Sequence, residues 1–179
     1  MEAIERYLEH FEKTIADLQG KLILDVGTGY PLFAMECAEQ NIARVVALEK
    51  NFESFGLARN SLAAKEFCLA IGCAEQLPFT DEMFELVITL FSVPILCQIE
   101  KNVSHTINEM CRVAKPGGEI WLAPLERPDL PELNEWIKVK LTALGNNRNY
   151  LLREGNMSKE IAGIPGSLRE FKYCVIKKL

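Results

Sequence analysis

The sequence has little of what marks a metal site, a secreted domain or a membrane protein. It contains two histidines and six cysteines, and no two cysteines form a C-x-x-C pair. A zinc site is therefore disfavoured, and we expect the cysteines to be small buried side chains in a reducing compartment. There is no apolar run of the roughly 18 residues that a membrane helix needs, and acidic residues stand where a signal peptide would be apolar. These absences predict a cytoplasmic protein without a membrane segment.

Positive charge is also scarce. The chain has 20 Lys and Arg residues against 25 Asp and Glu residues, which gives a net charge of −5, and it has no basic run. An acidic surface is a poor match for nucleic acid or for anionic membranes.

Internal repeats and low-complexity tracts are absent too. With 179 residues, of which 49% are hydrophobic, the composition predicts one domain over residues 1–179, and it leaves a homodimer open.

The stretch that organises the chain runs from Lys21 to Cys37 and reads KLILDVGTGYPLFAMEC. An apolar run, a glycine pair and a second apolar segment of helical length are typical of a buried parallel strand that turns into a helix. Gly27 and Gly29 can take positive φ and let the backbone lie against a ligand. Pro31 suits the first turn of the helix, whose free N–H groups form a partly positive end. This turn predicts a ligand site above the strand.

Two carboxylates flank the predicted site. Asp25 stands two residues before the first glycine, where it would repel a pyrophosphate but could accept hydrogen bonds from an amine. Glu49 ends the next apolar run, residues 44–49, close to the ~20-residue offset at which a βαβ unit places an acid on ribose hydroxyls. The alternative for Glu49 is an ordinary exposed side chain at a strand end. Because its position meets what the glycine loop requires, we favour the binding role.

Hydrophobic periodicity predicts the remaining elements. The spacing of Ile4, Leu8, Phe11, Ile15 and Leu18 predicts one N-terminal helix over residues 2–18, which packs on the sheet. Further helices are expected over residues 52–65, within 94–114 and over 132–144, the last capped by Asp129. Strands are expected over 67–71, 84–91, 119–123, 150–152 and 168–176. Ligands bind beyond the carboxyl ends of such strands, so Thr89, Leu90 and Phe91 are candidate contacts.

Four segments together resemble one family. Asp25-x-Gly27-x-Gly29 resembles motif I of the class I S-adenosylmethionine-dependent methyltransferases, in its small, UbiE-like or methyltransferase-11-like form. Residues 72–79 resemble the family segment G-D-A-E-x-L-P-F, residues 84–87 its F-D-L-V strand, and residues 112–118 its R-V-L-K-P-G-G signature. The resemblance covers roughly residues 22–122. It implies a doubly wound, Rossmann-like α/β fold: a mostly parallel seven-stranded sheet with helices on both faces and an antiparallel C-terminal hairpin.

The resemblance also implies a cofactor, S-adenosyl-L-methionine, with S-adenosyl-L-homocysteine as product. Carried over position by position, the cofactor-binding residues are Asp25, Gly27, Thr28, Gly29, Tyr30, Glu49, Lys50, Cys73, Ala74, Glu75, Thr89 and Leu90. Two positions depart from the family pattern. Pro31 stands where a third glycine is usual, and Cys73 replaces the acid that receives the adenine amino group, although a thiol is a weak acceptor. No catalytic residue and no metal ligand is assigned.

The function implied by the resemblance is methyl transfer to a small-molecule acceptor whose identity stays open. A sulfonium is already a good leaving group, so alignment of donor and acceptor matters more than a general base. One alternative is a non-catalytic subunit or regulator that binds S-adenosylmethionine or S-adenosylhomocysteine, which Pro31 and Cys73 favour. Another is a nicotinamide-dependent oxidoreductase, whose loop would want a glycine at the place of Leu32.

Overall fold

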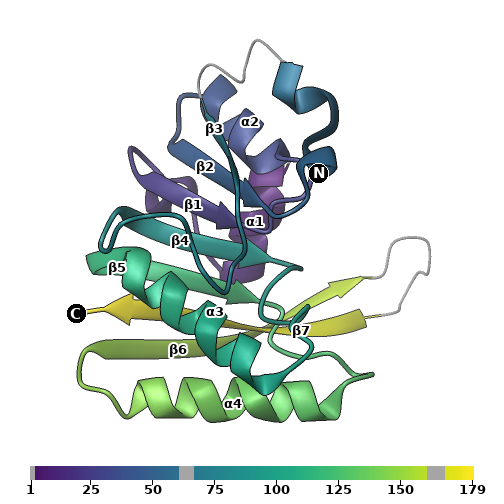
Figure 1. Cartoon of the computed structure of the whole chain (residues 1–179), viewed down its shortest axis with the longest axis vertical. Helices are drawn as coiled ribbons and strands as arrows, with labels where there is room; N and C mark the ends of the chain where they lie inside the picture. The colour runs from purple at the N-terminus through teal and green to yellow at the C-terminus, as the bar shows by residue number, and fades with distance from the viewer. Residues whose placement is uncertain (1–2, 61–66, 161–167) are drawn as a thin grey trace.

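The computed structural model describes residues 3–60, 67–160 and 168–179. Within them, seven strands form one sheet in the order β3-β2-β1-β4-β5-β7-β6 (Figure 1). The strands are β1 Leu22–Val26, β2 Arg44–Glu49, β3 Cys68–Ile71, β4 Phe84–Leu90, β5 Ala114–Ala123, β6 Tyr150–Glu160 and β7 Leu168–Lys178. The five strands from β3 to β5 pair in parallel. β7 runs antiparallel to β5 and to β6, which confirms the predicted C-terminal hairpin.

In the described part of the chain, four α-helices cover the two faces of this sheet. They are α1 Ala3–Phe11, α2 Leu32–Glu39, α3 Glu100–Val113 and α4 Pro131–Gly145. In β1, Ile23 packs with the cluster that contains α1 and α2, whereas Leu24 packs with the cluster that contains α3 and α4. Successive side chains of a strand point to opposite faces, so one fully buried strand supplies both cores. The predicted doubly wound α/β fold is confirmed (Figure 1).

The N-terminal helix is shorter than the periodicity predicted. α1 ends at Phe11, and Glu12 takes φ of 51°. A separate 3-10 turn, η1 Ile15–Asp17, follows because the Asp17 carboxylate accepts hydrogen bonds from both the backbone N–H and the hydroxyl of Thr14, at 2.9 and 3.0 Å. Such local bonds compete with helix continuation. Ile15, assigned to the buried stripe, is therefore 46% exposed.

Two other helix predictions need correction. Over residues 52–65 the structure describes a 3-10 segment, η2 Phe52–Asn60, that is broken at Gly56, and residues 61–66 lie outside the described part. Asp129 does not cap α4, since Leu130 occupies the N-cap. The Asp129 carboxylate is instead bound by Arg127, with Nη2 to Oδ2 at 2.5 Å.

The order of the strands fixes where a ligand can bind. From β1 the chain builds outward through β2 to β3, and then returns to β4 on the other side of β1. The helices on either side diverge at this reversal, which leaves a crevice beyond the carboxyl ends of β1 and β4. Among the residues that the structure describes, no helix combines the length and the apolar character that crossing a membrane requires.

Candidate functional site

The loop between β1 and α2 turns sharply because two glycines adopt positive φ, 72° at Gly27 and 59° at Gly29. The N–H groups of Gly27 and Thr28 both donate to the Leu48 carbonyl, at 2.8 and 3.1 Å, which holds the loop against β2. A Cβ at position 27 would lie 1.8 Å from Ser92 Oγ, whereas a Cβ at position 29 would meet nothing within 4 Å. Gly27 is thus required for packing, and Gly29 faces open space.

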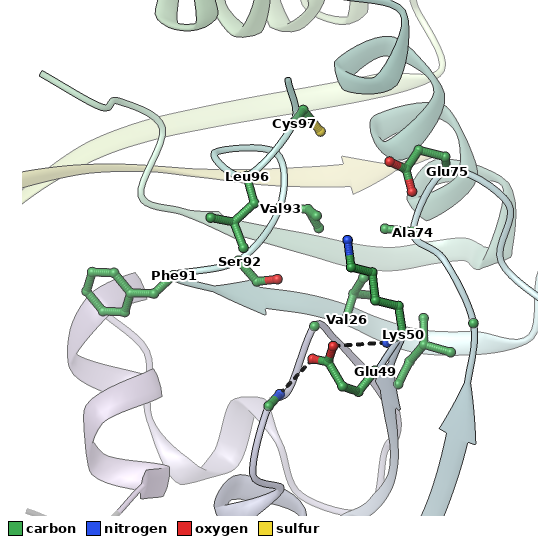
Figure 2. Close-up of a pocket in the computed structure, with 14 residues that line it drawn as sticks. Val26, Glu49, Lys50, Ala74, Glu75, Phe91, Ser92, Val93, Leu96 and Cys97 are labelled. Atoms are coloured by element: carbon green, nitrogen blue, oxygen red, sulfur yellow. Dashed lines mark hydrogen bonds between the residues drawn. The ribbon is translucent and has the colours of Figure 1, made fainter. Parts of the chain in front are cut away.

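Glu49 extends from the end of β2 toward this loop. Its Oε2 accepts the Gly29 N–H at 3.1 Å, and its Oε1 accepts the N–H groups of Lys50 and Asn51, at 3.0 and 3.2 Å. Figure 2 shows the Glu49 carboxylate with its hydrogen bonds as dashed lines, one of them to the Lys50 nitrogen. A carboxylate offers about four acceptor positions. Three backbone bonds therefore fix the orientation of Glu49 and leave capacity for a further donor.

A cavity of about 290 Å³ opens between these two strand ends. Its lining residues come from the ends of four parallel strands and the segments that follow them: Val26, Gly27, Gly29, Leu48, Glu49, Lys50, Gly72, Ala74, Glu75, Phe91, Ser92, Val93, Leu96 and Cys97. Two carboxylates and one ammonium give this lining a formal charge of −1. Such a surface attracts a ligand that carries positive charge.

The structure brings six of the twelve predicted cofactor residues to this cavity: Gly27, Gly29, Glu49, Lys50, Ala74 and Glu75. The other six lie outside its lining. The Tyr30 ring is 45% exposed and lies beside Gly56, and the exposed Cys73 forms an isolated bridge with Gln76. Thr89 and Leu90 are buried at the end of β4, where the Thr89 hydroxyl accepts the Val93 N–H at 3.3 Å.

The last two residues outside the lining are Asp25, which is buried beneath the loop, and Thr28, which is partly buried. Tyr7 of α1 donates its hydroxyl to the Asp25 carboxylate, at 3.1 Å to Oδ2, and Thr28 donates at 2.7 Å. The Tyr7 ring stacks on Phe33 of α2, with 4.3 Å between centroids. Burial raises the pKa of Asp25 to about 6, although the two hydrogen bonds and Arg6 oppose it. Burial also raises the pKa of Tyr7, with Asp25 adding to the effect.

Helix α3 holds the wall of the cavity that contains Ala74 and Glu75. Asn102 donates to Glu75 Oε1 at 3.2 Å. Arg112 donates to the carbonyls of Leu77 and Phe79, at 3.1 and 2.8 Å, and pairs with Glu109 and Asp81. Glu109 in turn accepts the Leu77 N–H at 2.8 Å. Arg112, the first residue of the 112–118 segment, therefore anchors the loop after β3 together with Glu109.

Sequence reasoning missed most of the segment after β4. Phe91, Ser92, Val93, Leu96 and Cys97 line the cavity, and only Phe91 was a candidate. The segment has no regular periodicity, and Phe91 takes φ of 56°, which is unusual for an aromatic residue. Ser92 had no signal in the sequence, since its packing against Gly27, with Oγ 1.8 Å from where a Cβ at position 27 would lie, is visible only in the structure. No group of three or more His, Cys, Asp or Glu side chains within the described ranges could hold a metal ion.

Comparison with known proteins identifies the family. Residues 24–122 match the family described as "Methyltransferase domain". The chain is 29% identical over 132 residues to the ubiquinone/menaquinone biosynthesis C-methyltransferase UbiE of Geobacter sulfurreducens, over 69% of this chain and 49% of that protein. It is 32% identical over 120 residues to the demethylmenaquinone methyltransferase of Shouchella clausii, over 63% of this chain and 48% of that protein. The chain thus spans about half the length of these relatives.

A solved structure shares the fold. The S-adenosylmethionine-dependent methyltransferase of Methanosarcina mazei superposes with a TM-score of 0.66 at 20% identity, over 98% of this chain and 96% of that one. The match over residues 24–122 includes the glycine loop, Glu49 and the segment after β3. The chain belongs to the class I S-adenosylmethionine-dependent methyltransferases. Membership in this family implies S-adenosyl-L-methionine as the cofactor.

Proposed function

We propose that this chain binds S-adenosyl-L-methionine in the cavity between β1 and β2 and transfers its methyl group to a small-molecule acceptor. One observation carries the proposal. A glycine loop with open space at Gly29, an oriented carboxylate at Glu49 and a second carboxylate at Glu75 line a single cavity at the carboxyl ends of parallel strands. At about 290 Å³ the cavity is just below the range of about 300–1,000 Å³ for small-molecule sites.

The residues present fit an adenosyl ligand. Glu49 would accept hydrogen bonds from the ribose hydroxyls, because three backbone donors already orient it toward the cavity. Glu75, oriented by Asn102, would accept from the nucleobase amino group in place of the acid that Cys73 replaces. The formal charge of −1 on the lining favours a sulfonium over a pyrophosphate. The opposite preference would be expected of a dinucleotide site.

The chemistry of the reaction is supplied by the cofactor, whose sulfonium carries an electrophilic methyl group and leaves as S-adenosyl-L-homocysteine after transfer. The chain has to orient the reactants and exclude water. Apolar side chains in the cavity lining would exclude water: Val26, Leu48, Val93 and Leu96. No side chain is assigned as a general base, since an acceptor that sheds its proton readily does not need one.

The acceptor is proposed to be a small molecule because of what the relatives are named for. Their names refer to ubiquinone, menaquinone and demethylmenaquinone. The composition agrees, since a net charge of −5 without a basic run is a poor match for a nucleic-acid substrate.

Calorimetric titration with S-adenosylmethionine, S-adenosylhomocysteine and NAD tests the binding step. We expect the two adenosyl ligands to bind and NAD not to bind. Glu49→Ala should weaken S-adenosylhomocysteine binding by about 1–3 kcal/mol, because it leaves the ribose hydroxyls without their acceptor. Glu39→Ala, which changes an exposed glutamate of α2 outside the cavity, is the matched control. Tight binding of NAD alone, or equal effects of the two variants, would contradict the proposal.

The non-catalytic alternative, an adenosyl-ligand-binding subunit, has one observation in its favour. The Asp25 carboxylate and the Cys73 thiol both lie outside the cavity lining, so two family contacts are missing there. An assay of S-adenosylhomocysteine release over a panel of neutral, anionic and cationic acceptors separates the two functions. Ligand binding without release for any acceptor would favour the subunit.

A further inference from the structure

A second cavity adjoins the one assigned to the cofactor. It measures about 500 Å³ and lies between the segment after β4 and the start of α4. Its lining residues are Leu96, Cys97, Gln98, Arg127, Leu130, Pro131, Glu132, Leu133 and Trp136. Leu96 and Cys97 line both cavities. A molecule in the second cavity would therefore lie one side chain away from the proposed cofactor.

The walls of this second cavity are mostly apolar. Leu133 is buried, Trp136 is partly buried, and Leu96 and Leu130 are 58% and 39% exposed. Exposed leucines that face a concave surface lose unfavourable contact with water when an apolar ligand covers them. The volume falls within the range of about 300–1,000 Å³ that is usual for small-molecule sites. Both features fit an apolar group of the size of a small molecule.

The positive charge in the lining, that of Arg127, is already paired with a carboxylate. Arg127 pairs with Asp129 through two nitrogens, Nε to Oδ1 at 3.2 Å and Nη2 to Oδ2 at 2.5 Å, and its Nη1 donates to the Ile95 carbonyl at 3.4 Å. Asn134 of α4 fixes the Arg127 backbone on both sides, at 2.7 and 3.0 Å. Arg127 therefore connects the loop before α4 to the segment after β4 through hydrogen bonds. Glu132 adds an exposed carboxylate to the lining. Because Arg127 is already paired, the lining offers an anion no unpaired cation.

Leu96 stands where several cavities meet. A third cavity of about 230 Å³ shares Leu96 and Phe91 with the cofactor cavity, and Leu96 and Arg127 with the second cavity. An exposed leucine at this junction separates the proposed methyl donor from the apolar cavity without closing either one. A rotamer change at one exposed side chain can therefore alter the access between them.

We propose that the 500 Å³ cavity holds the uncharged, apolar body of the methyl acceptor, with Leu96 at the boundary with the cofactor. This inference rests on the proposed function and specifies its substrate class. An acceptor recognised chiefly through a carboxylate or a phosphate group does not fit this lining.

Three naphthalene probes of matched shape test the charge preference: neutral 2-naphthol, anionic 2-naphthoate and cationic 2-naphthylmethylammonium. Each is titrated by calorimetry at pH 7.5 into protein saturated with S-adenosylhomocysteine. The neutral probe should bind about tenfold tighter than the anion. Equal or tighter binding of the anion or of the cation overturns the assignment to uncharged acceptors.

Two variants test the location. Leu130→Asp places a carboxylate at the cavity wall and should weaken 2-naphthol binding about tenfold or more. It should fold, because aspartate is a favoured N-cap residue and position 130 is the N-cap of α4. Val139→Asp is the matched control, since Val139 is 53% exposed on the same helix outside the lining. Equal effects of the two variants, or no effect of Leu130→Asp, overturn the location.

The same titrations distinguish this inference from the proposed function. Wild-type protein that binds S-adenosylhomocysteine but not 2-naphthol disproves the acceptor cavity and leaves the cofactor assignment standing. Protein that fails to bind S-adenosylhomocysteine disproves the proposed function. In that case the probes are titrated into the protein alone, and a retained preference for 2-naphthol, sensitive to Leu130→Asp, supports an apolar binding site of another function.

Discussion

Asp25→Asn is expected to change how the stability of the protein depends on pH. Asp25 is fully buried beneath the glycine loop, and burial raises its pKa from 3.8 to about 6. In the unfolded chain the carboxyl ionises near pH 3.8, whereas in the folded protein it keeps its proton up to about pH 6. Between these values the folded state binds more protons than the unfolded state. Its contribution to stability is therefore fully present below pH ~4 and is lost as the pH rises through 6.

The size of the effect follows from the two pKa values. Each pKa unit corresponds to about 1.4 kcal/mol, so the full shift is worth about 3 kcal/mol. Wild-type protein should lose about 2 kcal/mol of this between pH 4 and 7, because the unfolded carboxyl is already partly ionised at pH 4. Asparagine has a similar shape and does not titrate. The unfolding free energy of Asp25→Asn minus that of wild type should therefore rise by about 2 kcal/mol over that range. Any constant offset from the changed bonds to Tyr7 and Thr28 does not alter the slope.

Urea unfolding followed by circular dichroism, at intervals from pH 4 to 7.5, measures this difference. Asp17→Asn is the control. Partial burial of Asp17 is outweighed by the hydrogen bonds from Thr14, so the pKa of its carboxyl is lowered. Its stabilising term is present above pH ~4 and is lost below it, so the difference between this variant and wild type should show no rise. A flat difference for Asp25→Asn across pH 4–7 would refute a raised pKa at Asp25.

Three further substitutions test the site. Glu75→Gln should weaken binding of S-adenosylhomocysteine about tenfold and reduce the preference of the protein for this ligand over its inosine analogue, as measured by calorimetry. An unchanged preference would show that Glu75 does not contact the nucleobase. Cys73→Asp should leave that affinity unchanged, because Cys73 lies outside the cavity lining, and a tenfold gain would show that position 73 reaches the base. Arg112→Leu should lower the free energy of unfolding by about 2 kcal/mol in urea, since carbonyls of the loop after β3 lose their donor; a loss below about 0.5 kcal/mol would contradict the anchoring role.

The sequence predicted the position of site residues best at the ends of buried strands. Gly27, Gly29 and Glu49 were predicted from a strand that ends in glycines and from an acid at the expected spacing, and all three line the cavity. Motif transfer assigned both Cys73 and Glu75 to the cofactor. The Cys73 thiol is exposed and outside the cavity lining, while Glu75 lines the cavity. Which of two neighbouring side chains faces a cavity depends on the path of the loop.

By itself the sequence determined the alternation of strands and helices, because buried strands and amphipathic helices carry different hydrophobic periods. It also located the turn at Gly27 and Gly29, since positive φ favours glycine. The tertiary structure alone decided that Tyr7 covers Asp25, that η1 ends the first helical stripe early, and that Leu96 borders three cavities. Those outcomes depend on contacts between segments distant in the chain or on competing local hydrogen bonds, and neither leaves a periodic signal in the sequence.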